Sequence, residues 1–214
     1  MQIAILIFDG LTALDAIGPY EVLSRLPDAE VRFVATEPGP RRTDTGALGL
    51  NADLSLADLP HPEIMLVPGG PGSRPLMRDP GVLDWLRVGH EGSIWTTSVC
   101  TGALVLGAAG ILDGKRATTH WAYLDRLRDL GAEPVAQRVV EHGKVITAAG
   151  VSAGIDMALT LANRLAGEPA AQAIQLGIEY DPHPPFDAGS PDKAPPEVIE
   201  MVRSAERSSP EPGD

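Results

Sequence analysis

The stretch TTSVCTGALVLGAAGILDG, residues 96–114, contains Cys100, the only cysteine in a chain of 214 residues. β-Branched residues precede the thiol and small, helix-forming residues follow it. This pattern predicts a strand over residues 93–99, a sharp turn at Cys100 and a helix over residues 101–112. In an open α/β sheet, ligands bind beyond the carboxyl ends of the strands. The stretch therefore predicts an α/β fold that holds its thiol at the ligand-binding edge.

The rest of the chain alternates between strand-like and helix-like segments. Apolar or alternating runs predict strands over residues 2–8, 30–36, 63–67, 116–119, 135–141 and 144–148, the last two joined by a turn at His142-Gly143. Helical spacing predicts helices over residues 14–26, 80–88, 152–165 with Ser152 as N-cap, and 197–206. Such alternation predicts a mostly parallel central sheet with helices on both faces. We expect a single domain over residues 1–204 and a disordered tail over residues 205–214.

Charge and composition restrict the partners. The formal net charge is -12, which disfavours a nucleic acid or an anionic membrane and favours a small neutral or cationic ligand. The N-terminus, MQIAILIFDG, lacks the basic region and cleavage site of a signal peptide, and no apolar run reaches the length of a membrane span. We therefore expect a cytoplasmic protein. Its one cysteine cannot form an intramolecular disulfide.

The position of Cys100 favours a reactive thiol. The start of a helix stabilises a thiolate, so we expect the pKa of Cys100 to lie below that of a free cysteine. The small side chains of Ser98, Gly102 and Ala103 permit the tight turn. The alternative is that Cys100 is only a small buried hydrophobic residue.

Other predicted strand ends supply groups that could act with the thiol. Asp15 lies in an apolar stretch, LTALDAIGP, where desolvation would raise its pKa and make it a proton donor; its alternative role is to cap a helix. Gly69 and Gly70, in VPGGPG, would bring backbone N–H groups close to a ligand, and Gly70 is the better candidate because Pro71 cannot donate. Thr101 could face the reacting centre through its hydroxyl and its N–H.

Aromatic and histidine residues complete the candidate site. His120, in ATTHW, is the obvious base for a Cys-His pair, and Trp121 and Tyr123 either wall an apolar pocket or fill the core. The other histidines show no metal-ligand spacing, so we expect no metal; they are His61, His90, His142 and His183. The chain has neither GxGxxG nor GxxxxGK[ST], so no nucleotide cofactor is indicated.

The motifs taken together resemble the isonitrile hydratase family, in the ThiJ/PfpI group of the class I glutamine amidotransferase-like superfamily. The matching stretches are LDAIGPYEVL, PGGPG, TSVCTGALVLGAAGIL, KRATTHWAYL, AGIDMALTLA and YDPHPPFDAGSPDKAP. The resemblance implies a flavodoxin-like three-layer sandwich, usually a homodimer, with a nucleophilic cysteine at the elbow. It implies addition of water to a small neutral isonitrile, R–N≡C, to give the N-substituted formamide without a cofactor. The family's catalytic residues carry over onto Asp15, Cys100 and Thr101, with Gly69, Gly70, His120 and Trp121 as substrate-binding candidates.

Two other functions stay open at this point. One is a glyoxalase or protein-repair hydrolase that uses Cys100 on a carbonyl and needs His120 as its base. Protease-like and several glyoxalase-like relatives have histidine directly after the cysteine, whereas this chain has Thr101. The other is a non-catalytic stress sensor in which oxidation of Cys100 is the signal.

Overall fold

The structure, a computed structural model, describes residues 1–208. Its strands are β1 (Gln2–Leu6), β2 (Glu30–Ala35), β3 (Gly39–Arg42), β4 (Gly49–Ala52), β5 (Leu54–Ser55), β6 (Ile64–Val67), β7 (Trp95–Val99), β8 (Arg116–Ala117), β9 (Glu133–Pro134), β10 (Val139–His142) and β11 (Val145–Ala148). Its α-helices are α1 (Ala13–Leu23), α2 (Ser73–Leu76), α3 (Pro80–Gly92), α4 (Gly102–Ala108), α5 (Leu124–Asp129), α6 (Ala153–Ala166), α7 (Glu168–Gly177) and α8 (Pro196–Ser208). Two short 3₁₀ helices are η1 (Leu56–Asp58) and η2 (Trp121–Tyr123).

Seven strands form the central sheet in the order β10-β11-β7-β6-β1-β2-β5. All neighbouring pairs are parallel except the edge hairpin of β10 and β11. β1 and β6 are buried along almost their whole length, as expected for strands covered on both faces. The predicted mostly parallel sheet is confirmed.

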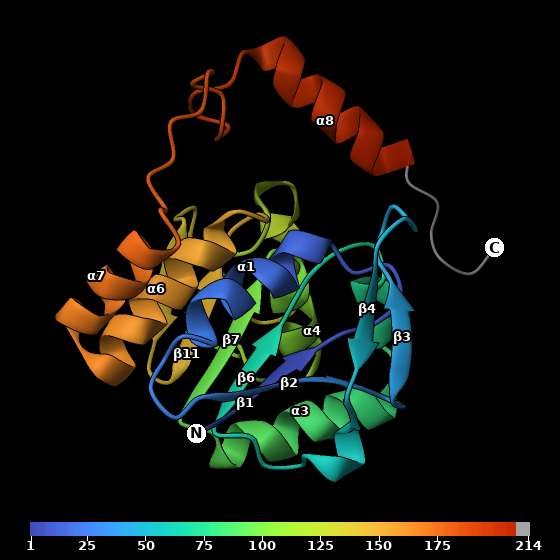
Figure 1. Cartoon of the computed structure of the whole chain (residues 1–214). Helices are drawn as coiled ribbons and strands as arrows, with labels where there is room; N and C mark the ends of the chain where they lie inside the picture. Colours follow the sequence, from blue (N-terminus) through green and yellow to red (C-terminus); the bar gives the residue numbers. More distant parts are fainter. Residues whose placement is uncertain (209–214) are drawn as a thin grey trace.

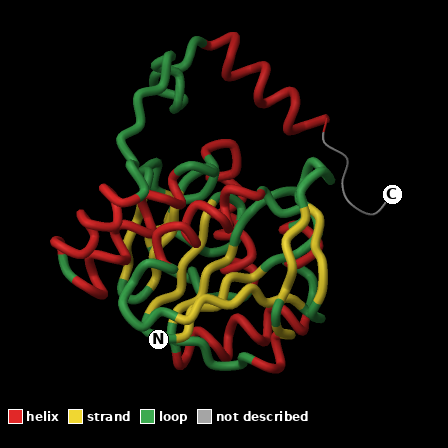
Figure 2. The backbone as a smooth tube through the Cα atoms, in the orientation of Figure 1, coloured by secondary structure: helices red, strands yellow, loops and turns green. Residues whose placement is uncertain are grey.

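Helices cover both faces of this sheet (Figure 1). α1, α6 and α7 pack together in one layer, and α3, α4 and α5 form the other. Figure 2 shows the strands passing between the two sets of helices. The carboxyl ends of β1, β6 and β7 therefore meet at one edge, each followed directly by the loop or helix that carries a candidate site residue.

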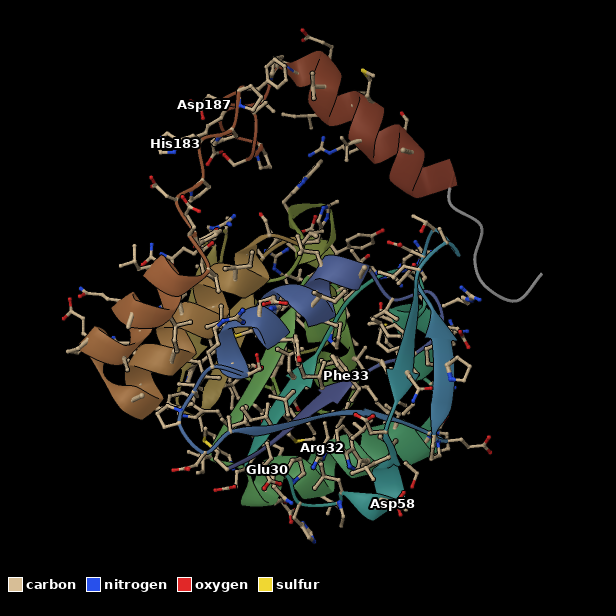
Figure 3. The ribbon with its side chains drawn as sticks, viewed as in Figure 1. Glu30, Arg32, Phe33, Asp58, His183 and Asp187 are labelled. Carbon is tan, nitrogen blue, oxygen red and sulfur yellow. The ribbon has the colours of Figure 1, made fainter. Side chains whose placement is uncertain are left out.

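The edge of the sheet formed by β2 and β5 is more exposed than its centre. β2 alternates between exposed and partly buried residues before it enters the core, and Figure 3 shows Glu30, Arg32 and Phe33 along it. The ring of Phe33 lies 5.5 Å from that of Tyr20, which packs α1 against this strand. The candidate site is therefore built on the buried strands rather than on this edge.

Several elements differ from the prediction. The hairpin of β3 and β4 and the helices α2, α5 and α7 are not predicted from the sequence. The helix predicted after Cys100 runs to residue 112, whereas α4 ends at Ala108. Gly110 has a φ of +78°, a left-handed conformation that stops the helix there. Ser152 occupies the N-cap position of α6, but its hydroxyl accepts a hydrogen bond from Arg138 and caps no N–H.

The C-terminal part leaves the sheet and its helices. After α7 the chain runs through a segment that carries His183 and Asp187 and reaches α8, which stands apart from the layers (Figures 1 and 3). α8 continues to Ser208, past the expected start of the tail at residue 205, and residues 209–214 lie outside the described residues. Within residues 1–208, no helix is both long enough and apolar enough to cross a membrane.

Candidate active site

Cys100 sits on a strained turn between β7 and α4. Its φ of +57° is left-handed, which is uncommon for a residue with a side chain, and its N–H donates to the carbonyls of Ala148 and Ala149 at 3.1 and 3.0 Å. A Cβ on Gly102 would lie 2.0 Å from the carbonyl oxygen of Val67, so only glycine allows α4 to start so close to β6. The sharp turn predicted from the sequence is present.

Asp15 is fully buried in the first turn of α1. Its Oδ2 accepts the N–H of Gly69 at 2.9 Å, while Oδ1 has no hydrogen-bond partner among the described residues. Thr12, not Asp15, occupies the N-cap position of α1, so the alternative capping role is wrong. Burial raises the pKa of Asp15 to about 7, although the Gly69 N–H and the Cys100 side chain both favour the carboxylate. The predicted rise is confirmed.

The prediction for the thiol itself is wrong in sign. Burial, assisted by the negative charge of Asp15, raises the pKa of Cys100 to about 12. Backbone N–H groups of Val151 and Thr101 favour the thiolate, as expected at the start of a helix, but do not offset desolvation. The side chain is only 6% exposed, so the sulfur carries a proton at neutral pH until a base removes it.

Thr101 and the glycine loop after β6 form one hydrogen-bonded unit. Thr101 Oγ1 accepts the N–H of Gly70 at 2.9 Å and the hydroxyl of Ser73 at 3.0 Å, and it donates to the carbonyl of Gly70 at 3.3 Å. The N–H groups of Gly69 and Gly70 therefore hold Asp15 and Thr101, not a ligand as the sequence analysis expected. A Cβ on Gly69 would lie 2.5 Å from the Thr101 nitrogen, so the loop has no room for a side chain.

A cavity of about 240 Å³ opens above this unit. Its lining comes from the ends of β1, β6 and β7 and from the short helices beyond them: Thr12, Asp44, Gly70, Pro71, Ser73, Arg74, Met77, Cys100, Thr101, Leu104, His120, Tyr123, Arg126 and Val151. The structure thus brings together Cys100, Thr101, Gly70 and His120, with Asp15 bound beneath them through Gly69.

His120 and Trp121 behave differently. His120 lines the cavity, and its Nδ1 accepts the N–H of Ala122 at 3.4 Å as the N-cap of η2. Trp121 instead lines a second hollow, of about 80 Å³, between the body and α8, where the guanidinium of Arg203 lies 5.6 Å from its ring centroid. The expectation that Trp121 contacts substrate beside Cys100 is therefore not met in this structure.

Sequence reasoning missed much of the cavity wall. Ser73 and Arg74 come from α2, Met77 directly follows it, and Arg126 comes from α5; the two helices have only four and six residues. Asp44 comes from the loop between β3 and β4, where Thr12 donates to it at 2.8 Å. The motif VPGGPGSRPLM signals a ligand loop, but nothing in it shows which later side chains face the thiol. Within residues 1–208, no group of three His, Cys, Asp or Glu residues could hold a metal ion.

Residues 1–164, more than half of the chain, match the model of the DJ-1/PfpI family. This chain belongs to that family. Isonitrile hydratase from Pseudomonas putida is 50% identical over 203 residues, which cover 95% of this chain and 89% of that protein. The resemblance inferred from the motifs is therefore confirmed.

Two further proteins are similar to this chain. A crystal structure of a ThiJ/PfpI family protein from Pseudomonas syringae superimposes with a TM-score of 0.93 at 36% identity, covering 96% of this chain and 86% of that one. The HTH-type transcriptional regulator CdhR from Pseudomonas aeruginosa is 30% identical over 81% of this chain but only 52% of the regulator. The flavodoxin-like sandwich predicted from the sequence is confirmed.

Proposed function

We propose that this chain is an isonitrile hydratase, which adds water to R–N≡C and releases R–NH–CHO. The observation that carries the proposal is the buried pair of Cys100 and Asp15 at the floor of the cavity, in a chain 50% identical to an isonitrile hydratase. An isonitrile carbon must gain both a nucleophile and a proton. A thiol beside a carboxyl group with a pKa near 7 can supply both.

In the first step, ionised Asp15 takes the proton of Cys100 as the sulfur attacks the terminal isonitrile carbon. This order follows from the two pKa values, since the thiol is the weaker acid and the carboxyl is partly ionised at neutral pH. Asp15 then delivers the same proton to the attacked carbon. The product is the thioimidate R–N=CH–S–Cys100, and Asp15 is again ionised.

In the second step, water adds to the thioimidate carbon. Asp15 takes a proton from the water and passes it to the nitrogen, giving R–NH–CH(OH)–S–Cys100. Collapse of this adduct forms the formamide carbonyl, expels the sulfur and returns the hydroxyl proton to it through Asp15. The N–H groups of Val151 and Thr101 favour the negatively charged sulfur at both stages. Thr101 contributes through its N–H, because its hydroxyl is occupied by Gly70 and Ser73.

The test is formamide production from cyclohexyl isocyanide, measured by gas chromatography with wild type, Cys100→Ala and Asp15→Asn. Loss of turnover by about 10³-fold or more in Cys100→Ala and at least about 10²-fold in Asp15→Asn is expected. Asp129→Asn is the matched control, since Asp129 is exposed on α5 and is not among the residues that line the cavity. Absence of turnover by reduced, folded wild type would refute the proposal.

The carbonyl-hydrolase alternative makes the opposite prediction for His120. In the proposed mechanism His120 takes no proton, and its Nδ1 accepts the N–H of Ala122. His120→Gln should therefore lower formamide production only a few fold, whereas a Cys-His hydrolase would lose nearly all activity. The sensor alternative predicts a response to peroxide without turnover of any isonitrile.

We also propose that the chain works as a homodimer in the cytoplasm. Phe186 and Met201, on the segment that leads to α8 and on α8 itself, are 79% and 71% exposed, and Leu176 on α7 is 80% exposed. Large exposed apolar side chains, two of them on the segment that leaves the body, favour a partner surface, here a second copy of the chain. Light scattering should give twice 22.5 kDa. A mass of 22.5 kDa would contradict the dimer.

A further inference from the structure

The outer wall of the cavity carries two guanidinium groups that the proposed mechanism does not use. Arg74 lies on α2 and is half-buried, and Arg126 lies on α5 and is exposed. Both line the same cavity as Cys100. Their presence needs an explanation, because the isonitrile group has no net charge for an arginine to bind.

The two arginines flank one aromatic side chain. Arg74 Nη2 lies 3.4 Å from the hydroxyl of Tyr123. Arg126 lies on α5, and Tyr123 is the N-cap residue directly before that helix, so both lie at the same end of the cavity wall. Leu127 is fully buried and fixes α5 against the body. The positive charges therefore converge on the Tyr123 side of the cavity.

Neither guanidinium is neutralised by a side chain. Within the part of the chain that the structure describes, Arg74 and Arg126 form no ion pair, whereas Arg87 and Arg128 pair with Asp84 and Asp125 at 2.6 and 2.7 Å. Both guanidinium groups line the cavity, so their positive charge is available to a ligand bound there.

One acidic residue also lines the cavity, and it lies elsewhere on the wall. Asp44 accepts hydrogen bonds from the Thr12 hydroxyl at 2.8 Å and from the Thr45 N–H at 2.8 Å, which hold it beside the start of α1. The cavity thus has an acidic side at α1 and a basic side at α2 and α5. A ligand with one negative group would be oriented by this difference.

We propose that the cavity binds isonitriles that carry a carboxylate on R, held by Arg74 and Arg126 while the isonitrile carbon faces Cys100. The inference rests on the proposed function and names its substrate class. Guanidinium groups bind carboxylates through paired, charge-assisted hydrogen bonds. Because Ser73 is bound to Thr101 and directly precedes Arg74, the carboxylate would be held at a fixed distance from the thiol. A cavity of about 240 Å³ limits the substrate to a short chain.

The experiment compares 3-isocyanopropanoate with its methyl ester, using formamide production for both. Wild type should turn over the carboxylate with a kcat/KM at least about 10-fold above that of the ester, and added salt should reduce this preference. The variant with Arg74→Met and Arg126→Met should lose about 10- to 100-fold in kcat/KM on the carboxylate, mainly through KM, and less than about threefold on the ester. Arg128→Met is the control, because Arg128 lies on α5 but pairs with Asp125.

A second variant tests the inference if the double variant folds poorly. Arg126→Glu replaces an exposed positive charge by a negative one. It should lower kcat/KM on the carboxylate relative to wild type and raise kcat/KM on 2-isocyanoethylamine, which carries a positive charge. The inference would be overturned if wild type had equal kcat/KM on the carboxylate and the ester, or if the variants lost equal fractions of kcat/KM on both. Turnover of the ester would in that case still support the hydratase. Absence of turnover with cyclohexyl isocyanide and the ester as well would instead refute the hydratase proposal.

Discussion

The floor and the outer wall of the cavity are built in opposite ways. The floor, defined by Asp15, Cys100 and Thr101, is buried, and backbone N–H groups of the loop after β6 fix Asp15 and Thr101. The wall, defined by Arg74, Tyr123, Arg126 and Met77, is partly or largely exposed and lies on or beside two short helices. The floor is held rigidly by burial and hydrogen bonds, which suits the reaction step. The side chains of the exposed wall can be replaced without disturbing the sheet.

This difference has an energetic cause. A carboxyl and a thiol in the floor are both held in a medium that disfavours their charged forms, so each affects the other strongly. Charges on the wall remain in contact with water, which screens them from the catalytic pair. They therefore act on the binding and orientation of the substrate. Substitutions in the floor should therefore change kcat, and those in the wall should change KM.

Outside the catalytic pair of Cys100 and Asp15, the largest effect is expected at Gly69, which joins Asp15 to Thr101. Gly69→Ala would place a Cβ 2.5 Å from the Thr101 nitrogen and 3.0 Å from Asp15 Oδ2, so the loop must move. We expect kcat to fall by about 10²-fold or more, measured as formamide production. Gly92→Ala is the control, because nothing lies within 4 Å of a Cβ there. A Gly69→Ala enzyme with normal kcat would break the view of the floor as a rigid unit.

Asp15 gives a pH-dependent test of the same floor. Its pKa rises from 3.8 to about 7 on folding, so the folded state keeps a proton that the unfolded state releases. The free energy of unfolding should fall as pH rises from about 4 to about 7, by an amount of the order of 4 kcal/mol. Asp15→Asn removes this term, so the variant should gain stability relative to wild type between pH 5 and pH 8.

Urea unfolding of wild type and Asp15→Asn at about pH 4 and about pH 7 measures the difference in their free energies of unfolding. Asp129→Asn is a suitable control because its carboxyl is exposed on α5 and does not contribute to the pKa shift of Asp15. Parallel stability curves for wild type and Asp15→Asn would show that the carboxyl is not buried as described. In activity assays, the rate should rise with pH through about 7, since ionised Asp15 accepts the thiol proton in the proposed mechanism.

A smaller effect is expected at Ser73, which holds Thr101 without facing the thiol. Ser73→Ala removes one hydrogen bond to Thr101 Oγ1 and should lower kcat about three- to tenfold with little change in KM. Ser93→Ala removes a comparable buried hydroxyl at the other end of the sheet. It should lower the melting temperature and leave kcat unchanged. If both variants lost the same fraction of kcat, Ser73 would have only a structural role.

The smallest effect is expected at Met77, the apolar residue of the wall. Met77 is half-buried and lines the cavity, so Met77→Ala should raise KM for cyclohexyl isocyanide about two- to fivefold and leave kcat unchanged. Val88→Ala, on the outer side of α3 and 43% exposed, should change neither constant. A fall in kcat for Met77→Ala would show that wall and floor are not separate.

The floor could be predicted from the sequence because each part follows a buried strand. Asp15, Gly69 and Cys100 each come shortly after an apolar run, and parallel strands bring their carboxyl ends to one edge. The wall could not be predicted, because α2 and α5 are too short to show a helical period. The predicted direction of the pKa shift at Cys100 was also wrong, because the sequence shows the start of a helix but not how deeply the thiol is buried.

By itself, the sequence determined the main alternation of strands and helices, the sharp turn at the thiol and the family to which the chain belongs. These depend on local pattern and on residues such as Gly102 that tolerate no substitute. Only the tertiary structure decided which groups are ionised, where the glycine N–H groups point and which charges face the thiol. Those properties depend on desolvation and on contacts between residues far apart in the chain, such as Gly69 with Asp15 and Ser73 with Thr101.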